Sequence, residues 1–323
     1  MLSGGDGGDS TGSAIAASGG NILGGSIGAT NLTTLVVTRS TFSGGIIRAG
    51  AGGDGVSGGG NPTGGLGGHA FGGAIGQQNG GTTTIANSTF SNLELEAGGG
   101  GNAGRGGPGG NGGNAFGGAL YQAGSQATLR NITVADNFVL GAPGGSGQGT
   151  STFGIGSGGG LYGPVNVANT IVSGSTAANG DSTTPSGVNC AGAITNSGHN
   201  LEFGASSCTG FVPGDPKLDA EANNGGPTQT RALLSGSAAI GTGDPSICAA
   251  ALPNGAGGID QRGVARLTGV CSIGAYEAVT APNPVPVVKP PGSNLGNPAS
   301  LPAARKPPGP NLGVPASLPP PRP

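Results

Sequence analysis

Residues 71–95 read FGGAIGQQNGGTTTIANSTFSNLEL, and the chain repeats this plan several times. Residues 116–140 repeat it as FGGALYQAGSQATLRNITVADNFVL. Weaker copies begin at Gly24, with GGSIGATNLTTLVVTRSTFSGG, and at Gly158, with GGGLYGPVNVANTIVSGS. A self-similar unit of this length is typical of repeat proteins, in which each repeat packs only against its neighbours. The sequence therefore predicts a stacked repeat architecture.

Aligning the copies produces three columns that are apolar in every copy. The three columns are Ile27, Ile75, Leu120 and Leu161; Val37, Ile85, Leu129 and Val167; and Phe42, Phe90, Val134 and Val172. The surrounding runs are rich in Thr, Val and Ile, which favour strands, and the dense glycine disfavours helix. Parallel stacking of such strands predicts an all-β parallel β-helix (a solenoid), with these side chains as ladders in its core.

A fourth column, between the second and third apolar columns, holds Arg39, Asn87, Asn131 and Asn169. Asn tolerates the left-handed backbone that a sharp corner needs. We therefore predict that Asn87, Asn131 and Asn169 are corner residues. Their amides are expected to hydrogen-bond to the repeats above and below.

Glycine accounts for 76 of the 323 residues, and there is no collagen-like third-position period. Three glycine-rich inserts, residues 44–68, 98–113 and 141–160, separate the repeats. They contain few apolar residues and glycine loses most entropy on ordering, so we expect long, mobile loops that project from one edge. The alternative is that these inserts pack as polyproline-II strands.

Four cysteines lie in the last third of the body, and their spacing does not resemble a metal knuckle. Of three connectivities, sequential pairing of Cys190 with Cys208 and of Cys248 with Cys271 is favoured; free thiols in a cytosolic protein are the alternative. Disulfides would indicate an oxidising, extracytoplasmic compartment. This segment, residues 189–278, is placed to be a disulfide-stabilised C-terminal cap over the last repeat.

The remaining boundaries follow from composition. Residues 1–20 are rich in Gly, Ser and Asp and are predicted to be flexible, residues 21–188 hold the β-helix repeats, and residues 279–323 form a Pro-rich extended tail. The first residues lack the basic and apolar regions of a signal peptide. No apolar run reaches 18 residues, so we do not expect an integral membrane protein.

The net charge of −2 combines −6 in residues 1–278, from 8 basic and 14 acidic groups, with +4 in the tail. The body has no basic patch, so we expect no nucleic-acid partner.

The repeats resemble those of right-handed parallel β-helix proteins of bacterial surfaces, including polymorphic outer-membrane protein repeats. The segment after residue 188 resembles the C-terminal part of the choice-of-anchor Q domain family. That resemblance rests on NC at 189–190, NL at 200–201, DPKL at 215–218, NNGGPTQTRALLSGSAAIGTGD at 223–244, IDQRG at 259–263 and CSIGAYE at 271–277. It departs from the family's usual residues at Arg231, Gly241 and Ser272. The resemblance implies a secreted or surface-attached bacterial protein.

Asp260, Arg262, Arg266 and Glu277 are the densest charged group in the chain. A ligand site is one reading, but we favour ion pairs that form a clasp within the cap. Calcium is weighed because GGDGGD at 4–9 fits the GGxGxD pattern of calcium-binding rolls. Those rolls need tandem nine-residue repeats, which are missing here, so we expect no metal or cofactor.

Catalysis by a β-helix polysaccharide lyase or hydrolase would need clustered carboxylates. Glu94 and Glu96 share a strand face, but no matching acid appears in the neighbouring copies, and His69 and His199 have no evident partners. We therefore expect a non-enzymatic extracellular or cell-surface structural or adhesive protein. Cell-surface or matrix polymers, or further copies that assemble into filaments, are the expected partners, and a polysaccharide-active enzyme is the alternative.

Overall fold

The computed structural model describes residues 1–11, 15–31, 34–56, 60–182 and 185–278. The predicted Pro-rich tail lies outside these residues. Residues 1–279 form one compact unit. Its described part is all-β, with short strands and one five-residue helix, α1 (Pro245–Ala249).

Five sheets take strands from successive repeats in order. The first three sheets are β1 (Leu2–Ser3), β7 (Ile46–Arg48), β13 (Glu94–Glu96), β18 (Phe138–Leu140), β23 (Thr176–Ala178) and β24 (Ser186–Gly187); β4 (Ile27–Thr30), β10 (Ile75–Gln78), β15 (Leu120–Gln122), β20 (Leu161–Tyr162) and β25 (Cys190–Ala191); and β5 (Thr34–Thr38), β11 (Thr82–Ala86), β16 (Ala127–Arg130), β21 (Val165–Ala168) and β26 (Ile194–Asn196). The other two are β6 (Thr41–Ser43), β12 (Thr89–Ser91), β17 (Thr133–Ala135), β22 (Ile171–Ser173), β27 (Leu201–Phe203) and β28 (Val212–Pro213); and β3 (Ile22–Leu23), β9 (Ala70–Phe71), β14 (Ala115–Phe116) and β19 (Gly156–Ser157). Pairing within these sheets is parallel except between β23 and β24. Two further pairs are β2 (Ser10–Thr11) with β8 (Gly55–Val56), parallel, and β29 (Leu218–Ala222) with β30 (Thr230–Leu233), antiparallel.

The strand registers place each aligned apolar column in one ladder. Ile75 pairs with Ile27 and Leu120, Ile85 with Val37 and Leu129, and Phe90 with Phe42 and Val134. The fourth repeat follows the same registers, through Leu161, Val167 and Val172. Most of these side chains are fully buried in one apolar cluster, and identical neighbours even stack, as Phe42 does on Phe90. The recurring apolar positions therefore mark the register, because each lies over its equivalent in the next repeat.

The predicted corner residues adopt the left-handed backbone. Asn87, Asn131 and Asn169 have φ angles of 47°, 51° and 51°, and Arg39 and His199 continue the column, each with a φ of 51°. A turn at this column separates the third sheet from the fourth.

The ladders continue past residue 188, which differs from the predicted boundary between repeats and cap. Strands β25, β26 and β27 pair in parallel with β20, β21 and β22. At this end Cys190 follows Leu161 in the first apolar column, and its disulfide to Cys208 brings residues 204–211 against the core cluster. Glu202 follows Val172, and its buried carboxylate accepts hydrogen bonds from the amides of Ser207 and Cys208, both at 2.9 Å. This short crossing segment, rather than the whole of residues 189–278, covers the last repeat.

The rest of the predicted cap, residues 215–278, lies along the side of the repeats, and we call it the lateral segment. Its β29–β30 hairpin and the residues after it pack on the outer face of the β6–β28 sheet. Ile171 and Leu201 of that sheet share an apolar cluster with Leu233, Ala239 and Ile273. The prediction of an end cap is wrong for this segment, because its apolar residues pack on the outer face of a sheet and not on the end of the ladders.

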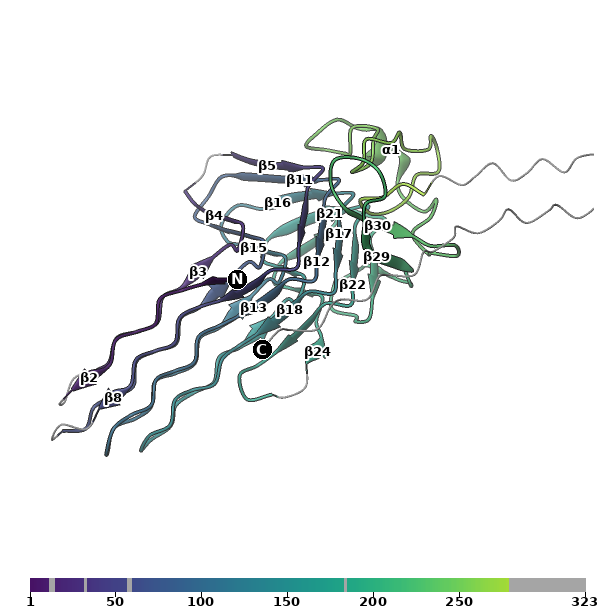
Figure 1. Cartoon of the computed structure of the whole chain (residues 1–323). Coiled ribbons are helices and arrows are strands. Elements are labelled where there is room, and N and C mark those ends of the chain that lie inside the picture. The colour runs from purple at the N-terminus through teal and green to yellow at the C-terminus, as the bar shows by residue number, and fades with distance from the viewer. Residues whose placement is uncertain (12–14, 32–33, 57–59, 183–184, 279–323) are drawn as a thin grey trace, which may run out of the picture. The chain divides into compact units, whose positions relative to one another are not determined.

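The glycine-rich inserts also differ from the prediction. They are extended hairpins that project beside one another, with β2 and β8 near their tips (Figure 1). Their outgoing arms are residues 4–10, 49–55, 97–103 and 141–146, and their return arms are residues 16–21, 63–69, 108–114 and 152–155. We call these eight arms the glycine lattice, and one outgoing arm with its return arm a layer. The arms are hydrogen-bonded to one another, so the inserts are not free loops.

Hydrogen bonds within the glycine lattice recur every third residue. Gly50 and Gly53 donate to the carbonyls of Gly20 and Ala17 in the preceding layer, while Ala49, Gly52 and Gly55 donate to carbonyls of the following layer. A period of three, with hydrogen bonds between neighbouring extended segments and none within a segment, is the geometry of packed polyproline-II helices. The period is local to each insert, in runs such as GGDGGD, GGLGGH and GGPGGNGGN, which is why the chain as a whole shows none.

Close packing explains why two positions of each lattice triplet are mostly glycine. A β-carbon added at Gly101 would lie 1.9 Å from the carbonyl oxygen of Gly53, and one at Gly110 would lie 1.8 Å from that of Gly65. The third residue of each triplet faces outward. Glycine is therefore required here by contact between backbones rather than by a turn.

The N-terminal residues belong to this arrangement, although residues 1–20 were predicted to be flexible. Leu2 and Ser3 pair with Ile47 and Arg48, and the amides of Gly4 and Gly7 donate to the carbonyls of Arg48 and Ala51. The Gly/Ser/Asp composition that suggested flexibility is the composition of a lattice arm.

Candidate functional site

The corner column is the surface on which the lateral segment lies. Arg39 donates to the carbonyl of Gln261 (3.2 Å), Asn87 to that of Ala256 (2.8 Å) and Asn131 to that of Ser272 (3.5 Å). Asn169 and Asp244 exchange two hydrogen bonds (3.0 and 2.8 Å), and His199 Nδ1 lies 2.8 Å from the carbonyl of Thr242. Asn169 also donates to Asn131 (3.4 Å), as expected within the column. The column therefore serves mainly to attach the lateral segment, a role the repeat alignment did not indicate.

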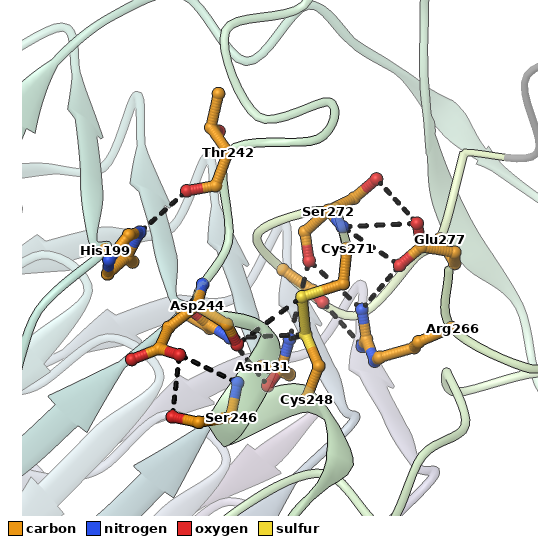
Figure 2. Close-up of a disulfide and its surroundings, with 12 residues drawn as sticks. Asn131, His199, Thr242, Asp244, Ser246, Cys248, Arg266, Cys271, Ser272 and Glu277 are labelled. Atoms are coloured by element: carbon orange, nitrogen blue, oxygen red, sulfur yellow. Dashed lines mark hydrogen bonds and ion pairs between the residues drawn. A yellow bond between two sulfur atoms is a disulfide. The ribbon is translucent and has the colours of Figure 1, made fainter. Parts of the chain in front are cut away.

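Arg266 and Glu277, two of the four predicted clasp residues, form a buried ion pair at 3.2 Å. All three guanidinium nitrogens of Arg266 donate, including to Asn87 Oδ1 at 2.9 Å and to the carbonyl of Ile259 at 3.1 Å. Burial lowers the pKa of Arg266 to about 10, and Glu277 opposes that shift, so the guanidinium stays charged at neutral pH. Figure 2 shows Glu277 between this guanidinium and Ser272.

Asp260 and Arg262, the other two clasp residues, form a second ion pair at 2.6 Å. The Asp260 carboxylate, which is fully buried, also accepts from the amides of Val264 (3.0 Å) and Glu277 (3.0 Å). The Arg262 guanidinium lies 3.7 Å from the centre of the Tyr276 ring. All four charged groups form ion pairs and hydrogen bonds within the lateral segment or with the corner column. This cluster therefore offers no free charged group to a ligand.

Both disulfides follow the sequential pairing. The Cys248–Cys271 bond joins α1 to the segment that carries the clasp, next to the corner column (Figure 2). Asp244 caps α1 by accepting from the hydroxyl (2.7 Å) and the amide (2.8 Å) of Ser246, and these hydrogen bonds, the one from the hydroxyl first, lower the pKa of Asp244. The Cys190–Cys208 bond lies at the end of the ladders instead.

Glu94 and Glu96 lie side by side on the outer face of β13, next to Arg48. Arg48 forms an ion pair with Glu96 through Nε and donates to it through a terminal nitrogen at 3.1 Å. A hydrogen bond to Glu96, together with burial, raises the pKa of Glu94, whereas the hydrogen bond from Arg48 lowers that of Glu96. The two shifts have opposite signs, as expected when two carboxylates share a site and one has a cationic partner.

The outward residues of the glycine lattice form the most regular exposed surface in the described part of the chain. In the outgoing arms, the side chain of Asp9 accepts from the amide of Asp54 (2.8 Å), Asp54 from Asn102 (2.7 Å) and Asn102 from Ser146 (3.0 Å). In the return arms, Asn21 accepts from His69 (2.7 Å), His69 from Asn114 (2.9 Å) and Asn114 from Ile155 (2.8 Å). Each of these six polar side chains thus satisfies an amide of the next layer that no carbonyl reaches.

These contacts change the interpretation of the GGDGGD motif. Asp6 and Asp9, the acids weighed as calcium ligands, each accept a backbone amide of the next layer, at 2.9 and 2.8 Å. Among the described residues, no group of three or more His, Cys, Asp or Glu side chains is placed to hold a metal ion. The motif belongs to the lattice, in which its period is three rather than nine.

A second exposed feature was missed by the alignment. Phe71, Phe116, Tyr121 and Tyr162 form a strip on the outer faces of the β3–β19 and β4–β25 sheets, with ring centroids 4.7 to 6.0 Å apart. The F and Y of the repeated FGGA(I/L) and (A/G)LY text were its only sequence signal. All four rings are half-buried and pack on one another, so the strip is a small aromatic cluster on the outside of the repeats.

Asn87-Ser-Thr and Asn131-Ile-Thr are formal glycosylation sequons, but both Asn side chains are buried in the corner column, where they serve as structural amides. No helix in the described part of the chain is long and apolar enough to cross a membrane. No family model, curated protein or solved structure matches this chain.

Proposed function

We propose that the chain is a non-catalytic, extracellular or cell-surface structural and adhesive protein. Its repeats form a single right-handed parallel β-helix of the kind found in choice-of-anchor Q and polymorphic outer-membrane proteins. The glycine lattice is the part that meets a partner, and the β-helix with its lateral segment is the support that holds the lattice.

The observation that carries this proposal is the regularity of the lattice surface. Its outward residues recur along each arm at every third residue, about 9 Å apart at the rise of a polyproline-II helix. Equivalent residues also recur from layer to layer, as in the exposed pair Leu66 and Asn111. A surface that repeats in two directions suits a polymer that itself repeats, such as a matrix or cell-surface polysaccharide.

The two disulfides support the location. Disulfides persist in oxidising compartments and are rare where glutathione keeps thiols reduced. A non-cytoplasmic setting therefore fits this chain, and a cell surface is the setting in which a repetitive binding face has a function.

The proposal predicts saturable binding of the full chain to an insoluble cell-surface or matrix polysaccharide without release of soluble sugar. Leu66→Glu, on the exposed lattice face, should weaken binding severalfold, because it adds charge to the contact surface. Val36→Glu is the matched control, since Val36 is similarly exposed but lies in strand β5, outside the glycine lattice. Co-sedimentation measures both. Equal binding by the two variants would place adhesion elsewhere, and no binding to any such polymer would contradict the adhesive role.

A polysaccharide lyase or hydrolase is the second candidate, because Glu94 and Glu96 have pKa values shifted in opposite directions. The ion pair between Arg48 and Glu96 speaks against it, because one of the two carboxylates is already held by a cation of the neighbouring strand. Sugar release that is abolished by Glu96→Gln would favour this candidate over the adhesive one.

Filaments of uniform width in negative stain would add self-assembly to the adhesive role, and monodisperse monomers would remove it.

A further inference from the structure

The first layer of the glycine lattice has an open face. Layers two to four are each covered by the layer before them. Residues 4–9 pair with the second layer, and the carbonyls of Gly5 and Gly8 accept from Gly20 and Ala17 of the same layer. No described residue covers the remaining side of residues 4–9. This open face is formed by backbone groups and by two glycines, Gly5 and Gly8.

Gly5 and Gly8 are glycines that nothing in the described structure requires. Their equivalents in the next layer, Gly50 and Gly53, would place a β-carbon 2.0 Å from the carbonyl oxygen of Gly5 and 2.2 Å from that of Gly8. Beyond their chain neighbours, Gly5 and Gly8 themselves have no atom within 4 Å of that position. Neither has a positive φ. In the second layer, the carbonyl oxygens of the first layer lie close to these positions. In the first layer the same space, beside Gly5 and Gly8, is empty of described atoms.

The hydrogen-bonding groups on this face are also unused. Among the described residues, none accepts from the amides of Asp6 and Asp9, and none donates to their carbonyls. The equivalent amides of Ala51 and Asp54 are satisfied by the side chains of Asp6 and Asp9. An incoming arm would need an acceptor side chain at every third residue to satisfy the amides of Asp6 and Asp9 in the same way.

The return arm limits what can bind. Ala17 stands where the second and third layers have Gly65 and Gly110. A β-carbon at Gly65 would lie 2.0 Å from the carbonyl of Ala17, so the side chain of Ala17 takes the place of such a carbonyl from a preceding layer. A complete hairpin therefore cannot continue the lattice here. The open face has room for one extended arm, beside residues 4–9.

We propose that residues 4–9 are a docking site for a single extended glycine-rich segment of another polypeptide, with the repeating sequence Gly-Gly-x. The residue x is Asn or Ser, which offers an acceptor without adding a negative charge beside Asp6 and Asp9. The segment would extend the lattice by one outgoing arm, as added strands extend a sheet edge. The inference rests on the lattice alone and is independent of polysaccharide adhesion.

The test titrates the ¹⁵N-labelled full chain with acetyl-(Gly-Gly-Asn)₃-amide and follows the amide signals of residues 4–9 by NMR. Saturable shifts confined to this arm are expected. Gly8→Ala should fold like the wild type and bind at least about tenfold more weakly, because the new methyl group takes the place of the incoming carbonyl. Acetyl-(Gly-Gly-Ala)₃-amide, which has no acceptor side chain, should bind more weakly than the Asn peptide.

Gly99→Ala is the matched control. Gly99 lies in an outgoing arm of the third layer, where the nearest atom to an added β-carbon is the Pro143 carbonyl at 3.9 Å, so this variant should fold and bind normally. Three results would each overturn the proposal. They are unmoved signals in the wild type, equal binding by Gly8→Ala, and a loss of melting temperature in Gly8→Ala, which would mean that the position is not open.

Discussion

Gly101→Ala is expected to lower the free energy of unfolding by about 1–3 kcal/mol, the usual cost of overpacking. The added methyl group would lie 1.9 Å from the carbonyl oxygen of Gly53, which is backbone and cannot rotate away. It would also disturb two hydrogen bonds, from Gly101 to the carbonyl of Gly65 and from Gly110 to that of Gly101. Urea unfolding, followed by circular dichroism, measures the loss.

Gly99→Ala, two residues away in the same arm, is the control for this prediction as well. Both substitutions remove a glycine from the same segment, so they change the entropy of the unfolded chain equally. A difference between them therefore reports the folded lattice. If the two variants were equally stable, the arm would not be packed as described.

Arg266→Met is expected to lower the free energy of unfolding by about 3–5 kcal/mol, the cost of breaking a buried ion pair from one side. Its loss would leave the Glu277 carboxylate, which is fully buried, without its cation. It would also remove the hydrogen bond to Asn87 that joins the clasp to the corner column. The lateral segment should therefore loosen from the repeats, which limited proteolysis of the variant would detect.

Two further variants separate the buried charge from the lost side chain. Arg266→Met with Glu277→Gln should recover part of the stability, because no unpaired charge then remains inside. Arg48→Met removes an arginine from an exposed ion pair and should change stability little. A loss as small for Arg266→Met as for Arg48→Met would show that the clasp does not hold the lateral segment.

The ladders of the fold could be predicted because a repeat makes its own register visible. Ile75, Ile85 and Phe90 each recur at a fixed place in every copy, and the strands pair at those places. The corner at Asn87 was predictable for a local reason, since few residues other than Asn and Gly accept its backbone. The clasp ion pairs were suggested by composition alone, and their partners in the column were not.

The glycine inserts were harder to predict because glycine usually signals freedom. Without side chains, an arm such as residues 97–103 gives no apolar pattern, and its stability comes from hydrogen bonds and backbone contacts to other inserts. Two signals were present in the sequence. One is the local period of three, and the other is the Asp, Asn or His that follows many of the glycine pairs, as in GGDGGD and at the end of GGLGGH. Read together across inserts, they indicate arms that share amide acceptors.

The lateral position of residues 215–278 depends on contacts that no local pattern shows. Gln261 reaches Thr89 and Thr41, which are far away in sequence and on the outer face of one sheet. Outward Thr and Ser in a strand usually face solvent, so the first three repeats did not indicate that this face is covered. The apolar residues at the outward positions of Ile171 and Leu201 were a signal that part of it is.

Amide hydrogen exchange of the full chain shows whether the glycine inserts are a packed lattice. We expect the buried amides of Gly53, Gly68, Gly101 and Gly113, which donate between arms, to exchange as slowly as those of the ladder strands. Exchange of these four amides at the rate of an unstructured peptide, beside protected ladder strands, would contradict a packed lattice.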